Sequence, residues 1–189
     1  RSFFEQFNEL RMEVPRLNLL SFKNENSDYT NNVTNLRNCY LLFSSDYNED
    51  CYYGVWLEKS KNSVDNYIVD ESELAYECFY SQKIYRSIFI FNSSQCSDSA
   101  FLYDCKSCSN CFMSYGLRNK QYYIENKQYT KEEYKKKMDE YNLGSNAELK
   151  KLKSYFEEFI KNCPRLYMQR IGRVESSTGD FLIDCNSCI

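Results

Sequence analysis

A spacing of twelve residues runs through the middle of the chain without insertion or deletion. Counted in twelves from residue 39, one column contains only small residues: Cys39, Cys51, Ser63, Ala75, Ser87, Ser99 and Cys111. A second column, counted from residue 43, contains six aromatic residues and one valine: Phe43, Val55, Tyr67, Phe79, Phe91, Tyr103 and Tyr115. A fixed period of this kind is the signature of a structural repeat in which each unit packs only on its neighbours.

Twelve residues are too few for a helix pair or a propeller blade, but they fit one turn of a narrow β-solenoid. Short apolar runs such as Ile88-Phe89-Ile90-Phe91, bounded by polar corners, are typical of its strands. The sequence therefore predicts a mainly β fold, a parallel β-solenoid whose coils pair at a strand spacing of about 4.8 Å. We place the small column inside, because a coil this tight has no room on its axis for residues larger than Cys. We expect the aromatic column to stack along one side.

Helices are predicted on both sides of the repeat. Residues 1–13 carry Phe3, Phe4, Phe7 and Leu10 at helical spacing, and Val14-Pro15 ends this amphipathic helix. After Tyr122 the period breaks.

The segment Thr130-Lys131-Glu132-Glu133 is a capping box that predicts a basic helix over residues 131–141. A second helix, with Asn146 as its expected cap, carries an apolar stripe. The stripe consists of Leu149, Leu152, Tyr155, Phe156, Phe159 and Ile160. Because the open edge of a solenoid needs a cover, we expect this helical pair to pack over the last coil.

A longer internal repeat appears when the end of the chain is aligned with its beginning. Residues 14–17 match residues 163–166 as Val/Cys-Pro-Arg-Leu, and at the same offset of 149 residues Phe7 aligns with Phe156 and Leu10 with Phe159. This predicts four segments, a helix with its connector at 1–26, a solenoid at 27–126, a helical cap at 127–162 and, at 163–189, a connector with the first coil of a second solenoid. We expect the complete protein to extend past Ile189 and to begin before Arg1.

The chain has ten cysteines and no histidine. Catalytic Ser/His/Asp or Cys/His arrangements and His-containing zinc sites therefore cannot be built from it. The spacing Cys105-x2-Cys108-x2-Cys111, with Cys96 one coil below Cys108, leaves an all-thiolate zinc site as a candidate, and a second CxxC near the end is half of another. The candidate ligands are Cys96, Cys105, Cys108, Cys111, Cys185 and Cys188. Because Ser and Ala replace Cys freely in the same columns, core packing is favoured over zinc or disulfide rungs, and no cofactor is expected.

Aromatic residues make up 17% of the chain, which is more than a thin solenoid core can absorb. We therefore expect some rings, including Tyr53 and Trp56, to face outward as platforms that bind proteins, sugars or unpaired bases. Residues 27–126 carry 13 acids against 8 bases, so a protein partner is favoured over nucleic acid. Acids at the corners, such as Glu49 and Asp50, are interpreted as a solvated face, in preference to a carboxylate pair for glycoside hydrolysis or calcium.

Four stretches of the chain resemble an uncharacterised family of cysteine-rich β-solenoid repeat proteins, seen in metagenomic sequences of uncultivated bacteria. They are Asn38-Cys39-Tyr40, Glu49-Asp50-Cys51-Tyr52-Tyr53, residues 117–134 and Ser177-Thr178-Gly179-Asp180-Phe181. Members of this family often carry CxxC zinc ribbons ahead of the first solenoid, and these are absent from this segment. If the complete protein has them, the resemblance implies a nucleic-acid or protein docking role outside these residues. The chain departs from the family by having Ser, Ala, Asn or Ile at many positions that are Cys elsewhere, which again favours packing over metal. The resemblance implies no catalytic residues.

The sequence thus predicts a non-catalytic binding or scaffold module that uses the outer face of the solenoid. One alternative is the repeat portion of a larger nucleic-acid-associated protein whose zinc-ribbon or nuclease region lies outside this chain. A less favoured alternative is a carbohydrate-active solenoid enzyme. The expected partner is another protein or a second copy, with no membrane, because no apolar run approaches the ~20 residues of a bilayer span. A cytoplasmic location is favoured, since the cysteines look reduced and no signal is visible.

Overall fold

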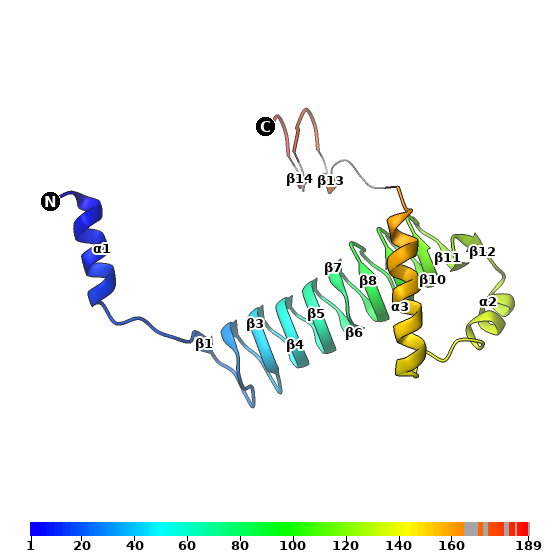
Figure 1. Ribbon diagram of the computed structural model, residues 1–189, viewed down its shortest axis with the longest axis horizontal. Coiled ribbons are helices and arrows are strands. Elements are labelled where there is room, and N and C mark those ends of the chain that lie inside the picture. The colour runs from blue at the N-terminus through cyan, green and yellow to red at the C-terminus, as the bar shows by residue number, and fades with distance from the viewer. Residues whose placement is uncertain (165–169, 172–173, 180–181, 184, 189) are drawn as a thin grey trace. The chain divides into compact units, whose positions relative to one another are not determined.

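The centre of the chain is a parallel β-solenoid of about nine turns (Figure 1). It is seen in a computed structural model that describes residues 1–164, 170–171, 174–179, 182–183 and 185–188. Strands account for 43% of the chain and helices for 20%, so the predicted mainly β solenoid fold is confirmed.

The solenoid strands hydrogen-bond in one continuous sheet, and the register between coils is always twelve residues. Ser21 pairs with Val33, Tyr40 with Tyr52, and the same step continues to the last parallel coil. The regular coils therefore begin at Ser21, well before the first member of the small column. The strands are β1 (Ser21–Phe22), β2 (Asn31–Thr34), β3 (Tyr40–Asp46), β4 (Glu49–Glu58), β5 (Lys61–Asp70), β6 (Glu73–Tyr76), β7 (Phe79–Gln82), β8 (Tyr85–Phe91), β9 (Ala100–Tyr103), β10 (Ser109–Tyr115) and β11 (Gln121–Ile124).

Within each coil the backbone repeats every three residues. Every third residue has a positive φ, as in Tyr53 (55°), Trp56 (59°) and Lys59 (48°). Each coil therefore has a square cross-section with four sides of three residues. In each side, two residues face outward and the third faces inward. The left-handed conformation costs about 1–2 kcal/mol for an ordinary residue. Hydrogen bonds between coils offset this cost, as where the N–H of Asp50 donates to the carbonyl of Arg37 at 3.0 Å.

Inward residues form four columns along the axis. The predicted small column is one of them, and all seven of its members are buried. The expectation that nothing larger than Cys fits the axis is wrong for the other columns, where Leu42 and Leu57 are fully buried. They fit because the inward residue between them is Gly54, where an added Cβ would lie 2.6 Å from the Cδ1 atom of Leu57.

Buried serine and asparagine side chains hydrogen-bond to the backbone N–H and C=O groups that point into the core and take no part in the hydrogen bonds between strands of neighbouring coils. The Ser63 hydroxyl donates to the carbonyl of Lys61 at 2.7 Å and accepts from the N–H of Ala75 at 3.3 Å. The buried Asn48 amide likewise accepts from the N–H of Ser60 at 2.8 Å and donates to the carbonyl of Leu57 at 2.9 Å. Since a buried backbone group without a partner is costly, these side chains are structural.

Helix α1 (Phe3–Glu13) begins at Ser2 with a capping box and ends at Val14, which confirms the predicted N-terminal helix. Helix α2 (Lys131–Met138) begins at the predicted Thr130 capping box and ends earlier than expected.

Helix α3 (Asn146–Lys161) is also present, but Asn146 is not its cap. Asn146 is already the first helical residue, and the Ser145 hydroxyl accepts from the N–H of Glu148 at 3.4 Å.

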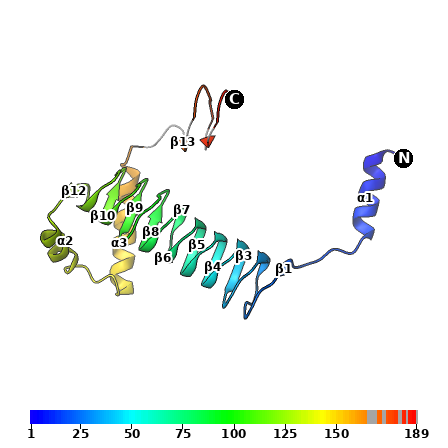
Figure 2. The ribbon, with the colours of Figure 1, turned by 180° about the vertical axis from the view of Figure 1, so that it is seen from behind.

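The helical segment contacts the last coil, since the ring of Tyr134 in α2 lies 5.7 Å from that of Tyr122 in β11. The strand β11 is also paired with an antiparallel strand, β12 (Lys127–Gln128). After β12 the chain turns back towards the later coils (Figure 2). The ring of Tyr141 lies 4.7 Å from that of Phe112, and Lys153 lies over the ring of Phe89 at 5.5 Å. The reason is that the aromatic side chains of the later coils, not the edge alone, need burial.

A second compact unit comprises residues Ser154–Ile189. In it β13 (Arg170–Ile171) pairs in parallel with β14 (Leu182–Ile183), and Arg170 again aligns with a residue twelve positions later. This register agrees with the prediction of a further coil. Residues 165–166 of the repeated connector and residues 180–181, 184 and 189 of the predicted coil lie outside the described residues.

Candidate binding surface

Two adjacent outer faces of the solenoid are aromatic, and each consists of two neighbouring columns. Face A comprises Tyr40, Leu41, Tyr52, Tyr53, Val64, Asp65, Tyr76, Glu77, Ile88, Phe89, Ala100, Phe101, Phe112 and Met113, and it begins with Asp28 and Tyr29. Face B comprises Phe43, Ser44, Val55, Trp56, Tyr67, Ile68, Phe79, Tyr80, Phe91, Asn92, Tyr103, Asp104, Tyr115 and Gly116.

Face A is covered in its later coils and open in its first coils. The rings of Phe89 and Phe101 stack at 4.5 Å and are buried, as is the ring of Phe112. In the first coils the ring of Tyr40 meets that of Tyr53 edge-on at 5.8 Å, and Tyr53 is 52% exposed. The exposed end of face A is therefore a preformed aromatic surface on a rigid backbone.

Face B carries the second predicted column, and it lies outside the coil. The rings of Phe79 and Phe91 stack at 5.1 Å with an interplanar angle of 6°, as expected for an aromatic ladder. Trp56 projects from this face and is 62% exposed. The expectation that Tyr53 and Trp56 face outward is thus met, and the two residues lie on adjacent faces of one coil.

The two remaining faces are mainly polar, with Tyr47, Leu74 and Tyr85 as exposed exceptions, and several of their charges pair from coil to coil. Glu49 lies between two bases, with an ion pair to Arg37 and another to Lys61 at 3.3 Å. Arg86 and Asp98 pair in the same way one coil apart, at 2.6 Å. Paired, solvated corners support the interpretation of the acids as a charged exposed surface. Such surface pairs contribute little to stability, at most about 1 kcal/mol each.

The four cysteines Cys96, Cys105, Cys108 and Cys111 all point inward and are buried, and none of the described cysteines is in a disulfide. In its neutral form each thiol of this cluster donates to backbone carbonyls, as the inward serines do. Cys108, for example, donates to the carbonyl of Lys106 at 3.3 Å.

The thiols of this cluster also approach one another. Those of Cys96, Cys105 and Cys111 lie within hydrogen-bonding reach of Cys108 and would donate to its thiolate, which lowers the pKa of Cys108. The same hydrogen bonds, followed by burial, raise the pKa values of the other three thiols.

Two further thiol environments stand out. A hydrogen bond from Cys51 lowers the pKa of Cys39 to about 7, whereas the pKa of Cys51 is raised by the same contact. Burial raises the pKa of Cys78 to about 12. Cys78 is therefore a buried neutral thiol and a packing group, since reactivity needs an accessible thiolate.

Among the described residues, no group of three or more Cys, Asp or Glu side chains has an arrangement that could hold a metal ion. The remaining candidates, Cys185 and Cys188, lie in the second compact unit, the first half-buried and the second exposed. The thiols around Cys108 make hydrogen bonds that zinc would have to replace, because a zinc ligand must be a thiolate.

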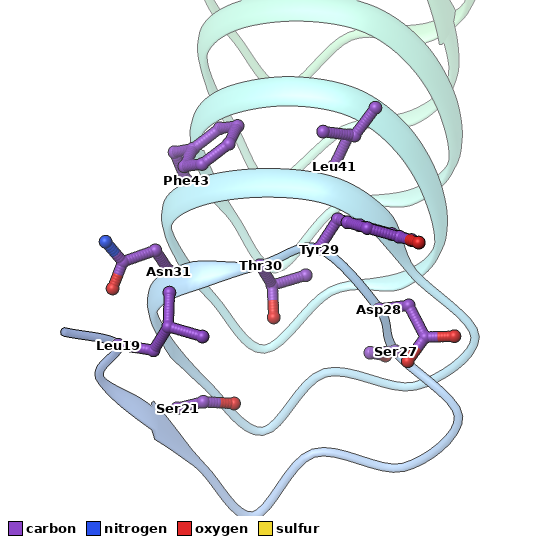
Figure 3. Close-up of a pocket in the computed structure, with 9 residues that line it drawn as sticks. All are labelled: Leu19, Ser21, Ser27, Asp28, Tyr29, Thr30, Asn31, Leu41 and Phe43. Carbon is purple, nitrogen blue, oxygen red and sulfur yellow. The ribbon is translucent and has the colours of Figure 1, made fainter.

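A shallow pocket of about 540 Å³ lies where the chain enters the first coils, and sequence patterns could not have located it. Leu19, Asn31 and Phe43 line one side in a column, Tyr29 lies on the other, and Thr30 lies between them (Figure 3). Asp28 is the only carboxylate in its lining. The pocket lining therefore offers apolar contacts but no pair of side chains that could act as general acid and general base.

No helix in the described ranges is long and apolar enough to cross a lipid bilayer. Comparison of the chain with protein-family models and with curated proteins gives no match. Two solved structures show weak similarity. One, a proposed acetyltransferase from Bacillus cereus, has 11% sequence identity and a TM-score of 0.19, over 73% of this chain and 89% of that chain. The other, a hexapeptide transferase family protein from Anaplasma phagocytophilum, has 10% identity and a TM-score of 0.18, over 77% and 98%. At these scores neither similarity carries an argument about function.

Proposed function

We propose that this chain is a non-catalytic binding module that docks protein partners on its outer aromatic surface, centred on Tyr53 and Trp56. The observation that carries this proposal is the segregation of the outer surface. Two adjacent faces present most of the outward aromatic rings, and the other two are mainly polar, with several charges paired from coil to coil. Tyrosine and tryptophan are the residues most enriched among those that dominate protein-protein binding energy.

The backbone that carries these rings is held by its neighbours on both sides. Val55 pairs with Phe43 in the coil below and with Tyr67 in the coil above. Binding therefore costs little backbone ordering, and the flat side of stacked coils suits an extended segment or a helix of a partner.

Charge favours protein over nucleic acid as the ligand. Residues 27–126 carry 13 acids against 8 bases, and several of those bases are already in ion pairs. A groove that follows a phosphate backbone needs excess positive charge. The alternative function, as the repeat portion of a larger nucleic-acid-associated protein, would place that contact in other regions.

Trp56 is the only tryptophan of the chain, so its fluorescence reports directly on this surface. Peptides displayed on phage should be selected on the wild-type protein and counter-selected on Trp56→Asp. The selected peptides should shift the emission of Trp56 and bind about tenfold more weakly to Tyr53→Asp.

The matched control is Tyr47→Asp, which changes the same residue type at the same left-handed backbone position on a polar face. This variant should keep full peptide affinity. Parallel titrations use a single-stranded oligonucleotide and a soluble polysaccharide. If either of these shifts Trp56 emission and no peptide does, protein binding is the wrong function.

A further inference from the structure

Helix α1 presents an apolar stripe that no described residue of the chain covers. The helix is complete, with a Ser2 capping box, and none of its residues is buried. On the stripe Phe3 stacks on Phe7 at 6.0 Å, and Phe4 is 79% exposed. A helix of this length is marginal in water unless its apolar face packs against another surface.

A second uncovered apolar surface lies on the same chain, at the open end of face A. There Tyr29 meets Tyr40 edge-on at 5.3 Å, and Tyr40 meets Tyr53 at 5.8 Å. Leu41 lies in the same column as Tyr53, one coil earlier. These residues continue, without a break in register, the face that the helical segment covers in the later coils.

The internal repeat connects the two surfaces. At the offset of 149 residues, α1 aligns with the second half of α3, so that Phe4 aligns with Lys153 and Phe7 with Phe156. Phe156 is only 2% exposed, whereas its counterpart Phe7 is open to solvent. The stripe of α1 thus matches a helix face that is buried elsewhere in the same chain.

The contacts of Lys153, the last residue of the first compact unit, show which surface the first half of α3 covers. Lys153 pairs with Glu77 and lies over the ring of Phe89, and both residues belong to the left-handed column of face A. In the open coils the same column offers Tyr53 and Leu41. In α3 the positive Lys153 meets the negative Glu77. In α1 the aligned residue is the apolar Phe4, and the corresponding column of the open coils holds the apolar Leu41 and Tyr53.

We propose that α1 of one copy docks on the open end of face A of a second copy, and that the two copies exchange their helices reciprocally. The proposal rests on the proposed function and names the partner of one of the two aromatic faces. A reciprocal exchange has two-fold symmetry, the commonest form of a homodimer.

The area available fits this arrangement. The exposed parts of the α1 stripe amount to roughly 400 Å², given that an aromatic side chain buries on the order of 150–250 Å². With a similar area lost on face A, two reciprocal contacts bury about 1,600 Å², the size of a standard specific interface, whereas one contact alone is of lattice-contact size.

The test is sedimentation equilibrium of the full chain over a concentration series up to about 200 µM, which detects a dimer of micromolar affinity. Wild type should be a dimer, and both Phe4→Asp and Tyr53→Asp should weaken self-association at least tenfold. Each variant has a matched control. Met12→Asp alters an exposed apolar residue on the opposite side of α1, and Tyr47→Asp alters a polar face of the solenoid. Both controls should remain dimeric.

A charge exchange distinguishes docking between copies from docking within one copy. Phe4→Lys and Tyr53→Glu recreate the Lys153 and Glu77 pair on the new interface, and each variant alone should be monomeric. An equimolar mixture should form a heterodimer, because the changed helix meets the changed face and the native helix meets the native face.

Three results would overturn the proposal: a monomeric wild type, a dimer that survives both Asp variants, and a mixture of charge variants that stays monomeric. Every variant must keep a cooperative unfolding transition in urea, which establishes that the solenoid is folded. Peptide binding reported by Trp56 is a separate readout. If it persists in a monomeric wild type, this inference fails while the proposed function stands.

Discussion

The hydroxyl of Ser99 accepts a hydrogen bond from the backbone N–H of Cys111 at 3.1 Å, one coil further along the axis. The same hydroxyl donates to the carbonyl of Ser97 at 2.7 Å. The thiol of Cys111 in turn donates to the carbonyl of Ser109 at 3.4 Å. Ser and Cys therefore both donate to the carbonyl two residues earlier in the chain. This shared geometry explains why the two residue types alternate in one column.

Ser99→Ala should destabilise the protein by about 1–3 kcal/mol, because the inner N–H of Cys111 loses its partner in a buried site. Urea unfolding followed by circular dichroism measures this change. Ser94→Ala is the control, since Ser94 occupies an outward position of the preceding side of the coil and should change stability by less than about 0.5 kcal/mol. Equal losses in the two variants would contradict the structural role of the inward hydroxyl.

Gly54→Ala should cost about 1–3 kcal/mol through overpacking, since the added Cβ would lie 2.6 Å from Leu57 and 3.1 Å from Leu42. Adding Leu57→Val, which shortens the side chain in closest contact, should recover part of the loss. The double variant is compared with both single variants in urea. If the losses of the single variants simply add, the two positions do not share this space.

The stability of the protein should fall above pH 9 because of Cys78. Its pKa is raised from 9.0 to about 12 by burial, so the thiol ionises in the unfolded chain before it ionises in the folded one. The stabilisation is complete below pH 9 and is lost as pH rises towards 12. By pH 10 the loss attributable to Cys78 is about 1.4 kcal/mol.

Unfolding free energies of wild type and Cys78→Ser at pH 8 and pH 10 isolate this effect. The variant keeps every other titrating group, so wild type should lose more stability over this interval. A difference of zero between the two proteins would mean that Cys78 is not buried as a neutral thiol.

Purified protein should contain well below one zinc per chain, and EDTA should leave its unfolding curve unchanged. The reason is that the thiols around Cys108 donate to backbone carbonyls, as the serines of the core do. Cys108→Ser should therefore be tolerated, with a cost of less than about 1.5 kcal/mol. One tightly bound zinc per chain, lost together with stability in this variant, would restore the metal interpretation.

Much of the fold follows from local and periodic signals. The column from Cys39 to Cys111 is uninterrupted, and only a coil of twelve residues keeps all of its members inside. Ser2 and Thr130 form helix caps with a glutamate three residues later, a contact that needs no tertiary structure. Asn146 was misassigned because Ser145, next to it, is an equally good cap.

The candidate surface could be predicted only in outline. Seventeen per cent aromatic residues in a thin solenoid implied exposed rings, and Tyr53 and Trp56 are indeed outside. The sequence did not indicate that they lie on two different faces, nor that one of these faces is buried further along, where Phe101 and Phe112 are covered.

The sequence by itself determined the period, the inward column and the presence of the three helices, because each depends on residues close together or on strict spacing. Tertiary structure decided the rest. Bulky residues such as Trp56 and Phe89 adopt a left-handed backbone against their own preference, because bonds between coils hold every third residue there. The helical segment also contacts a flank of the later coils, because the aromatic side chains there are buried by packing that no local signal specifies.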